Sequence, residues 1–272
     1  MSRIITALIL LPVLIASVLF TSLAWLFIAL ALVAMAFGLY EFWSLAKRCD
    51  LRPEIFIGSV SAAALFAAFV FDAPQRGPAL LLLIIIALTV AALSAQMLRG
   101  VPFDQMLASS GATILGVLYV TVLGGHLVAV RTGFEQTRGA HLLSFFFLVI
   151  MGSDTGAYYT GRALGRHKLA PRVSPGKTWE GAAGGMLASL LLATLAHYWF
   201  FAELPLSVAL LLAAAMNLLG VVGDLTESAL KRGAGAKDAA QILPGHGGLL
   251  DRLDSLLFNA PLIYYFGRFY FH

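Results

Sequence analysis

The feature that most constrains the fold is a succession of long apolar stretches. A helix needs about 20 apolar residues to cross the roughly 30 Å hydrocarbon core of a bilayer. Of the 272 residues, 60% are hydrophobic and only 12% are charged, against about 25% charged in ordinary soluble domains. We therefore predict an all-α, polytopic integral membrane protein with about nine transmembrane helices. The candidate spans are 4–20, 22–46, 55–72, 78–97, 109–130, 142–161, 182–202, 206–226 and 255–271.

The distribution of basic residues predicts the orientation of these helices, because cytoplasmic loops are enriched in Lys and Arg. With nine spans and the N-terminus inside, fourteen of the 18 Lys and Arg residues lie on one side and four on the other. The two polar loops, 162–181 and 227–254, are on the richer side. We expect both loops to face the cytoplasm, where a soluble nucleotide is found.

Chemically useful side chains concentrate in the second half of the chain. Residues 1–140 are expected to be transmembrane support, with lipid access or dimer contact as their role, and residues 141–272 to be the catalytic region. The single cysteine, Cys49, excludes an internal disulfide. The net charge of +4 suits anionic lipid headgroups, whereas basic residues spread over several loops argue against nucleic-acid binding.

Asp154 lies within an apolar span, where a carboxylate costs about 2.5 to 3.5 kcal/mol. We expect it to face a polar cavity that binds substrate; a structural ion pair with Arg162 is the alternative. The nearby Gly152, Gly156 and Gly161 also allow another helix to pack closely.

The segment from Ser174 to Thr178 is suited to binding a triphosphate. It combines a proline turn, a glycine, two hydroxyls and the Lys177 ammonium just before a helix expected from residue 182. It is not a P-loop, because position 171 is proline. The positive-inside bias alone also explains basic residues here. Glu180 is expected to cap the helix, with help in positioning a metal as the alternative.

Two pairs of acidic residues suggest a divalent cation. Asp224 shares a helix face with Glu227 and Ser228, and Asp251 and Asp254 are likewise three residues apart. Oxygen ligands of this kind favour Mg²⁺, so we predict a site formed by Asp224, Asp251 and Asp254. The alternatives are a helix-dipole role for the last two and a Glu227 salt bridge to Lys231.

Between these acids, glycines flank His246 in Pro244-Gly245-His246-Gly247-Gly248. Glycine backbones can direct amides at phosphate oxygens. The histidine either contacts the phosphates or braces the turn.

These residues resemble the phosphatidate cytidylyltransferase (CDP-diacylglycerol synthase) family. The family's C-terminal pattern matches Ser228, Lys231-Arg232, Lys237-Asp238, Pro244, His246-Gly247-Gly248 and Asp251-Arg252-Leu253-Asp254. Its second region matches Asp154-Thr155, Gly161-Arg162, His167-Lys168-Leu169 and Ser174 to Gly181. The likeness covers about residues 152–255; the N-terminal half is similar only in being hydrophobic and multi-spanning. Ala239 and Ala240 depart from the small hydroxyl or glycine expected there.

The resemblance implies an enzyme that transfers CMP from CTP to phosphatidic acid, giving CDP-diacylglycerol and pyrophosphate, in the inner membrane of a bacterium. It implies Mg²⁺, with a second or monovalent cation and a homodimer left open. The implied catalytic residues are Asp224, Asp251, Lys231, Arg232 and Lys237. The implied substrate-binding residues are Asp154, Ser174, Lys177, Thr178, Ser228, His246, Gly247, Gly248 and Arg252.

Two other function classes are consistent with parts of the pattern. A polyprenol or lipid kinase, or a CDP-alcohol transferase, shares the phosphate chemistry. The CDP-alcohol transferases normally carry an Asp-Gly-x-x-Ala-Arg run with aspartates four apart, whereas Asp251 and Asp254 are three apart after His-Gly-Gly. An ion-coupled transporter also places acids such as Asp154 and Asp224 within spans. Replacing CTP by ATP in an assay separates the kinase from the cytidylyltransferase.

Overall fold

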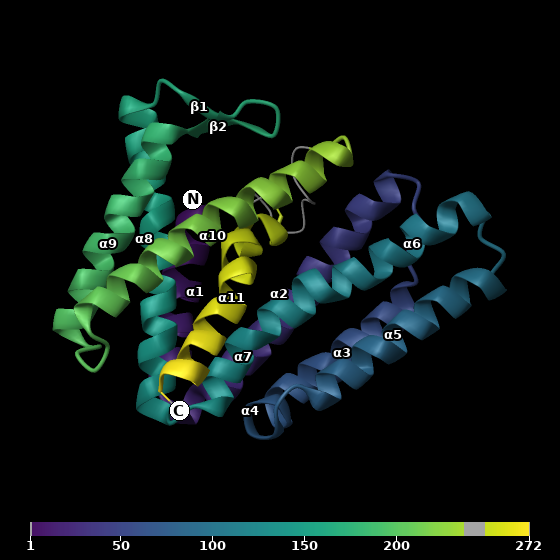
Figure 1. Cartoon of the computed structure of the whole chain (residues 1–272), viewed down its shortest axis with the longest axis horizontal. Coiled ribbons are helices and arrows are strands. Elements are labelled where there is room, and N and C mark those ends of the chain that lie inside the picture. Colours follow the sequence, from purple (N-terminus) through teal and green to yellow (C-terminus); the bar gives the residue numbers. More distant parts are fainter. Residues whose placement is uncertain (1, 237–247, 272) are drawn as a thin grey trace.

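The computed structural model describes residues 2–236 and 248–271, and this part of the chain is a bundle of long helices with one small hairpin (Figure 1). The first half contains α1 (Ser2–Leu19), η1 (Thr21–Leu23), α2 (Ala24–Arg48), α3 (Ile55–Phe71), α4 (Ala73–Arg76), α5 (Ala79–Leu98), α6 (Phe103–Gly116), the π-helix η2 (Val117–Val122) and α7 (Leu123–Gly133). The second half contains α8 (Gln136–Leu164), β1 (Lys168–Ala170), β2 (Ser174–Thr178), α9 (Trp179–Trp199), α10 (Leu206–Gly233) and α11 (Leu250–Tyr270).

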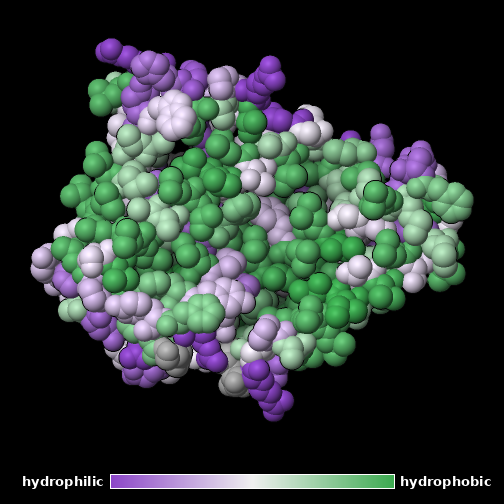
Figure 2. All heavy atoms as spheres, in the orientation of Figure 1, coloured by the Kyte–Doolittle hydropathy of each residue, from purple (hydrophilic) through white to green (hydrophobic). Residues whose placement is uncertain are grey.

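The helices confirm an all-α, polytopic membrane architecture. Within the described residues, six helical segments are long and apolar enough to cross a membrane, and α3 is apolar but shorter, so the count of nine spans is not confirmed. Figure 2 shows hydrophobic residues in a broad band across the drawn face, with hydrophilic residues gathered at its upper and lower edges. The band is the surface expected against lipid. The six segments are Thr21–Arg48, Ala79–Leu98, Phe103–Gly133, Gln136–Leu164, Trp179–Trp199 and Leu206–Gly233.

The loop predicted between residues 162 and 181 contains an antiparallel hairpin. Lys168 in β1 is opposite Thr178 in β2, and the turn closes with a hydrogen bond from the Val173 N–H to the Ala170 carbonyl, 3.2 Å. The prediction of a turn at Ser174–Lys177 was therefore wrong. This segment is a β-strand whose backbone pairs with β1. The hairpin lies at the end of α8 and α9 (Figure 1).

Helices α8 and α9 pack very closely because small residues line their contact. A Cβ atom on Gly156 would lie 2.5 Å from the Ala188 Cβ and 2.9 Å from the Gly184 carbonyl oxygen. The close packing predicted for this glycine is confirmed, and it follows from the rule that small residues let helix backbones approach in membranes.

The last helix connects the two halves of the molecule. Helix α11 packs against α10 on one side and against α7 and α2 on the other. Its buried positions include Leu257 and Ile263, which belong to the same apolar core as Phe42 of α2 and Val128 of α7. The division at residue 140 stays a prediction, but residues from both parts form one core.

Candidate active site

A polar cavity of about 480 Å³ lies where α8, the hairpin, α9 and α10 meet. Its walls include two carboxylates, Asp154 and Asp224, two cations, Arg162 and Lys177, and the Asn217 amide. Such groups are expensive in the apolar part of a membrane protein and are usually functional there. The cavity therefore has the properties expected of a site for a polar ligand beside the bilayer.

Lys177 connects the hairpin to the end of α10. Its ammonium forms an ion pair with the carboxylate of Asp224, and the side chains are 23% and 36% exposed, respectively. One turn further along α10, the Ser228 hydroxyl donates to Asp224 Oδ1 at 3.4 Å. The structure thus places three predicted site residues from two separate segments in direct contact.

Lys231 connects α10 to α11 in the same way. Its Nζ lies 2.6 Å from Glu227 Oε2 and 2.5 Å from Asp251 Oδ1. The Gly248 N–H donates to Asp251 Oδ2 at 3.1 Å. The predicted Glu227–Lys231 salt bridge is confirmed, and the same ammonium also neutralises Asp251.

Asp251 lies in the first turn of α11, ahead of the apolar part of that helix. Burial by itself raises the pKa of its carboxyl, but the interactions with Glu227 and Lys231 and the Gly248 N–H bring the pKa below its usual value. The group is therefore held as a carboxylate.

Glu41 of α2 fixes the beginning of α11 and was missed by the sequence analysis. Its carboxylate accepts hydrogen bonds from the N–H groups of Leu249 at 2.9 Å and Leu250 at 2.7 Å, and the residue is fully buried. The first N–H groups of a helix lack partners within the helix and favour an anion. A carboxylate inside an apolar span is the signal that identified Asp154, and it identifies Glu41 equally well.

Comparison with known proteins places this geometry in a family. Residues 1–270 match the Cytidylyltransferase family. The chain belongs to this family. Proteins named phosphatidate cytidylyltransferase are similar to it: that of Haemophilus influenzae is 43% identical over 136 residues, covering 48% of this chain and 47% of the relative. That of Bacillus subtilis is 39% identical over 163 residues, 60% and 58% of the two chains.

A third relative of the same name, from Staphylococcus saprophyticus, is 44% identical over 128 residues, 47% of this chain and 49% of the relative. The chain thus matches about half the length of the Haemophilus and Staphylococcus relatives.

The remaining substrate-binding residues predicted from the sequence have mixed outcomes. Ser174, Lys177 and Asp154 line the cavity. Thr178 also lines it, but its hydroxyl caps α9 by accepting from the Gly181 N–H at 3.1 Å. Arg252 is exposed in the first turn of α11. Lys237, His246 and Gly247 lie outside the described residues.

Three further side chains make contacts that the sequence did not indicate. Arg232 donates to the carbonyls of Val173 and Ala236, both at 3.3 Å, and so links α10 to the hairpin turn. Arg162 donates to the Tyr158 hydroxyl at 3.2 Å rather than forming a described ion pair with Asp154. Glu180 lies in the first turn of α9, as the predicted capping role requires, and also makes contacts outside its own helix.

Glu180 also anchors the segment that leads into the hairpin. Its carboxylate accepts from the Arg166 N–H at 3.1 Å and from the His167 N–H at 3.2 Å, and it lies 2.6 Å from His167 Nδ1. This carboxylate therefore holds the start of the hairpin that presents Lys177.

The predicted metal ligands do not form one cluster within the described residues. Within residues 2–236 and 248–271, no three His, Cys, Asp or Glu side chains lie together as a metal site requires. Asp224 pairs with Lys177 and Asp251 with Lys231, whereas the charge of buried Asp254 interacts with those of Asp224 and Asp154. These donors are all carboxylate oxygens, which fit Mg²⁺. The magnesium site stays a prediction.

Proposed function

We propose that this chain is a phosphatidate cytidylyltransferase, which transfers CMP from CTP to phosphatidic acid and releases pyrophosphate. The observation that supports this most directly is the contact between Lys177 of the hairpin and Asp224 of α10, at the edge of a polar cavity. The similarity to proteins of that name agrees with it. A nucleotide that binds from the aqueous side and a lipid that binds from the membrane side can meet only in a cavity near the membrane surface.

The reaction needs no nucleophile from the protein. A phosphate oxygen of phosphatidic acid forms a bond to the α-phosphorus of CTP, and the bond from that phosphorus to the α,β-bridging oxygen breaks. Pyrophosphate leaves with the electron pair. The protein must therefore align two anionic substrates and reduce their repulsion.

The described side chains assign these tasks to different elements. Lys177 and Arg162 line the cavity and supply positive charge for the triphosphate. Lys231 is shared between α10 and α11 and fixes Asp251 in place. We assign Lys177 to CTP binding and Lys231 to the alignment of the acidic residues.

Bound Mg²⁺ would supply positive charge at the reacting phosphates, and Asp224, Asp254 and Asp251 are the residues that would hold it. If Asp224 held the metal, the Lys177 ammonium that pairs with it would be available to the triphosphate. We further propose an inner-membrane location with the hairpin and the end of α10 facing the cytoplasm, as the basic residues predict.

The experiment that tests the activity measures lipid-soluble label from CTP labelled at the α-phosphate, with purified protein, phosphatidic acid and Mg²⁺. We expect label to enter the lipid with CTP and not from γ-labelled ATP, and chelation of Mg²⁺ to stop the transfer. Transfer of the γ-phosphate of ATP would show a lipid kinase instead. Uptake by sealed vesicles without nucleotide turnover would favour a transporter.

The role of Lys177 has a matched control in the same hairpin. Lys177→Ala should raise the KM for CTP about tenfold or more, because a charge-assisted phosphate contact contributes about 1.5 to 3 kcal/mol. Arg172→Ala removes a cation that is exposed and outside the cavity lining and should leave KM unchanged. Equal effects of the two substitutions would contradict the assignment of Lys177 to CTP.

A further inference from the structure

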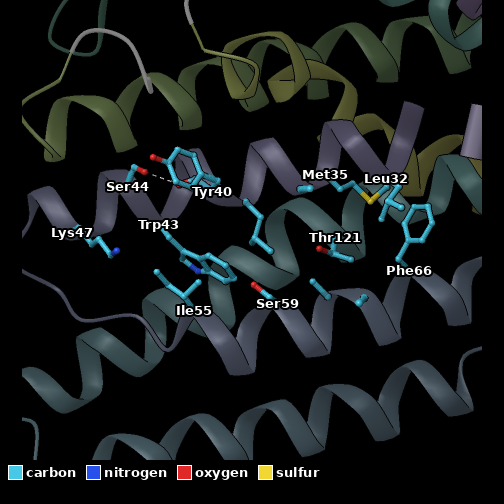
Figure 3. A pocket seen from close by; sticks show the side chains of 14 residues that line it. Leu32, Met35, Tyr40, Trp43, Ser44, Lys47, Ile55, Ser59, Phe66 and Thr121 are labelled. Carbon is cyan, nitrogen blue, oxygen red and sulfur yellow. Dashed lines mark hydrogen bonds between the residues drawn. The ribbon is translucent and has the colours of Figure 1, made fainter. Parts of the chain in front are cut away.

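A second cavity, of about 270 Å³, opens between α2 and α3, and its lining shares no residue with the polar cavity. Its walls are mostly apolar (Figure 3), with Met35 of α2 near Phe66 of α3 at one end and Trp43 of α2 near Ile55 of α3 toward the other. Small side chains on α3 leave the hollow open: Ser59, Ala62 and Ala63. At its rim, Leu32 is 47% exposed and Tyr40 60% exposed, so the cavity opens to the lipid-facing surface. We call it the α2–α3 groove.

One end of the groove is basic. Lys47 and Ile55 line both the groove and an adjoining hollow of about 520 Å³, which also contains Arg52, Arg99 and Asp50. Arg99 is paired with Glu54 at 2.9 Å. None of the ion pairs described for this chain involves Lys47 or Arg52, so the hollow offers positive charge to an anion.

The basic end lies at the same side of the membrane as the catalytic lysine of α10. The Cys49 thiol, two residues after Lys47, donates to the Gly233 carbonyl at 3.6 Å, and Gly233 is the last residue of α10. The groove and the end of α10 are therefore placed at the same membrane interface.

The groove has the length of an acyl chain. Leu32 and Lys47 lie at its two ends on α2 (Figure 3), which corresponds to roughly 22 Å of helix. One leaflet of the hydrocarbon core is about 15 Å thick. A lipid acyl chain whose headgroup lies beside Lys47 can therefore cross one leaflet entirely within the groove.

We propose that the α2–α3 groove binds an anionic membrane phospholipid, with one acyl chain between the helices and its phosphate at Lys47 and Arg52. The charge of the hollow selects an anionic headgroup, and the apolar length of the groove selects a lipid rather than a soluble phosphate. This lipid is separate from the substrate, because its site shares no lining residue with the polar cavity. Bound there, it holds α2, and hence Glu41, at a fixed depth in the membrane.

Native mass spectrometry of the purified protein, titrated with phosphatidylglycerol or phosphatidylcholine, tests the proposal. We expect phosphatidylglycerol to bind at least fivefold more tightly, because a basic residue near the interface contributes about this factor. Lys47→Gln should remove that preference, Lys47→Arg should keep it, and Arg48→Gln should not alter it, because Arg48 lines neither hollow.

A second pair of variants tests the apolar part of the groove. Ala63→Phe fills it, whereas Ala64→Phe places the same ring on an exposed neighbouring position outside the lining. Only Ala63→Phe should release phosphatidylglycerol, while both variants elute as the parent does in size-exclusion chromatography. Equal binding of the two lipids, equal binding by the two variants, or a lipid-free dimer that Ala63→Phe dissociates would each overturn the proposal.

Discussion

Lys231 contacts two acidic side chains from different helices. Its side chain is 12% exposed, that of Glu227 1% and that of Asp251 18%. A buried ion pair contributes little net stability, but loss of one member leaves the other charge uncompensated. The lysine is therefore more important as the shared cationic partner of two acidic side chains in a confined space than for any single attraction.

Substitution of Lys231 should accordingly affect stability and activity together. Lys231→Met is expected to lower the free energy of unfolding by about 3 to 5 kcal/mol and to abolish cytidylyl transfer. Thermal unfolding in detergent measures the first effect. Lys231→Arg keeps the charge and should unfold close to the parent temperature; a Met variant as stable as the Arg variant would contradict this account.

At the scale of elements, the α8–α9 pair determines where the hairpin lies. The hairpin joins these two helices, and their spacing depends on glycines such as Gly156 and Gly184. Lys177 is on the hairpin, so the separation of α8 and α9 determines the distance between Lys177 and Asp224.

Gly156→Ala should therefore be destabilising even though alanine favours helices. Its Cβ would lie 2.5 Å from that of Ala188, and overpacking of this kind costs about 1 to 3 kcal/mol. Gly111→Ala is the matched control, because nothing lies within 4 Å of a Cβ there, and it should be neutral or stabilising by about 0.5 to 1 kcal/mol. Similar unfolding temperatures for the two variants would disprove the packing argument.

At the scale of the whole molecule, the two halves are joined at the site itself. Glu41, from the second helix, holds the beginning of the last helix, which contains Asp251 and Asp254. The N-terminal helices thus contribute directly to the position of the acidic residues, in addition to any role in support.

Glu41→Ala should loosen the start of α11 and reduce activity. It leaves the Leu249 and Leu250 N–H groups without acceptors, at about 1 to 3 kcal/mol for each buried group. Hydrogen exchange at residues 248–252 should become faster, with α8 unaffected. Glu135→Ala, an exposed acid that makes no capping hydrogen bond, should change stability by less than about 0.5 kcal/mol; unchanged exchange in Glu41→Ala would refute the role.

The sequence predicted the elements better than their contacts. Apolar length predicted the helical membrane architecture, and the i, i+4 spacing predicted the Glu227–Lys231 pair. It could not show that Lys177 meets Asp224 or that Lys231 meets Asp251, because these contacts join elements far apart in the chain. The hairpin was missed because its strands are very short, and Glu41 because the first half was interpreted as support alone.

The capping of α11 by Glu41 has a consequence for biosynthesis. The carboxylate enters the membrane early, and its two N–H partners are synthesised about 200 residues later. Until then an acid within an apolar segment has neither of these donors, at a cost of about 2.5 to 3.5 kcal/mol. A nascent chain that stops short of its final helix therefore retains this penalty, and α2 reaches its full stability in the membrane only after α11 has been made.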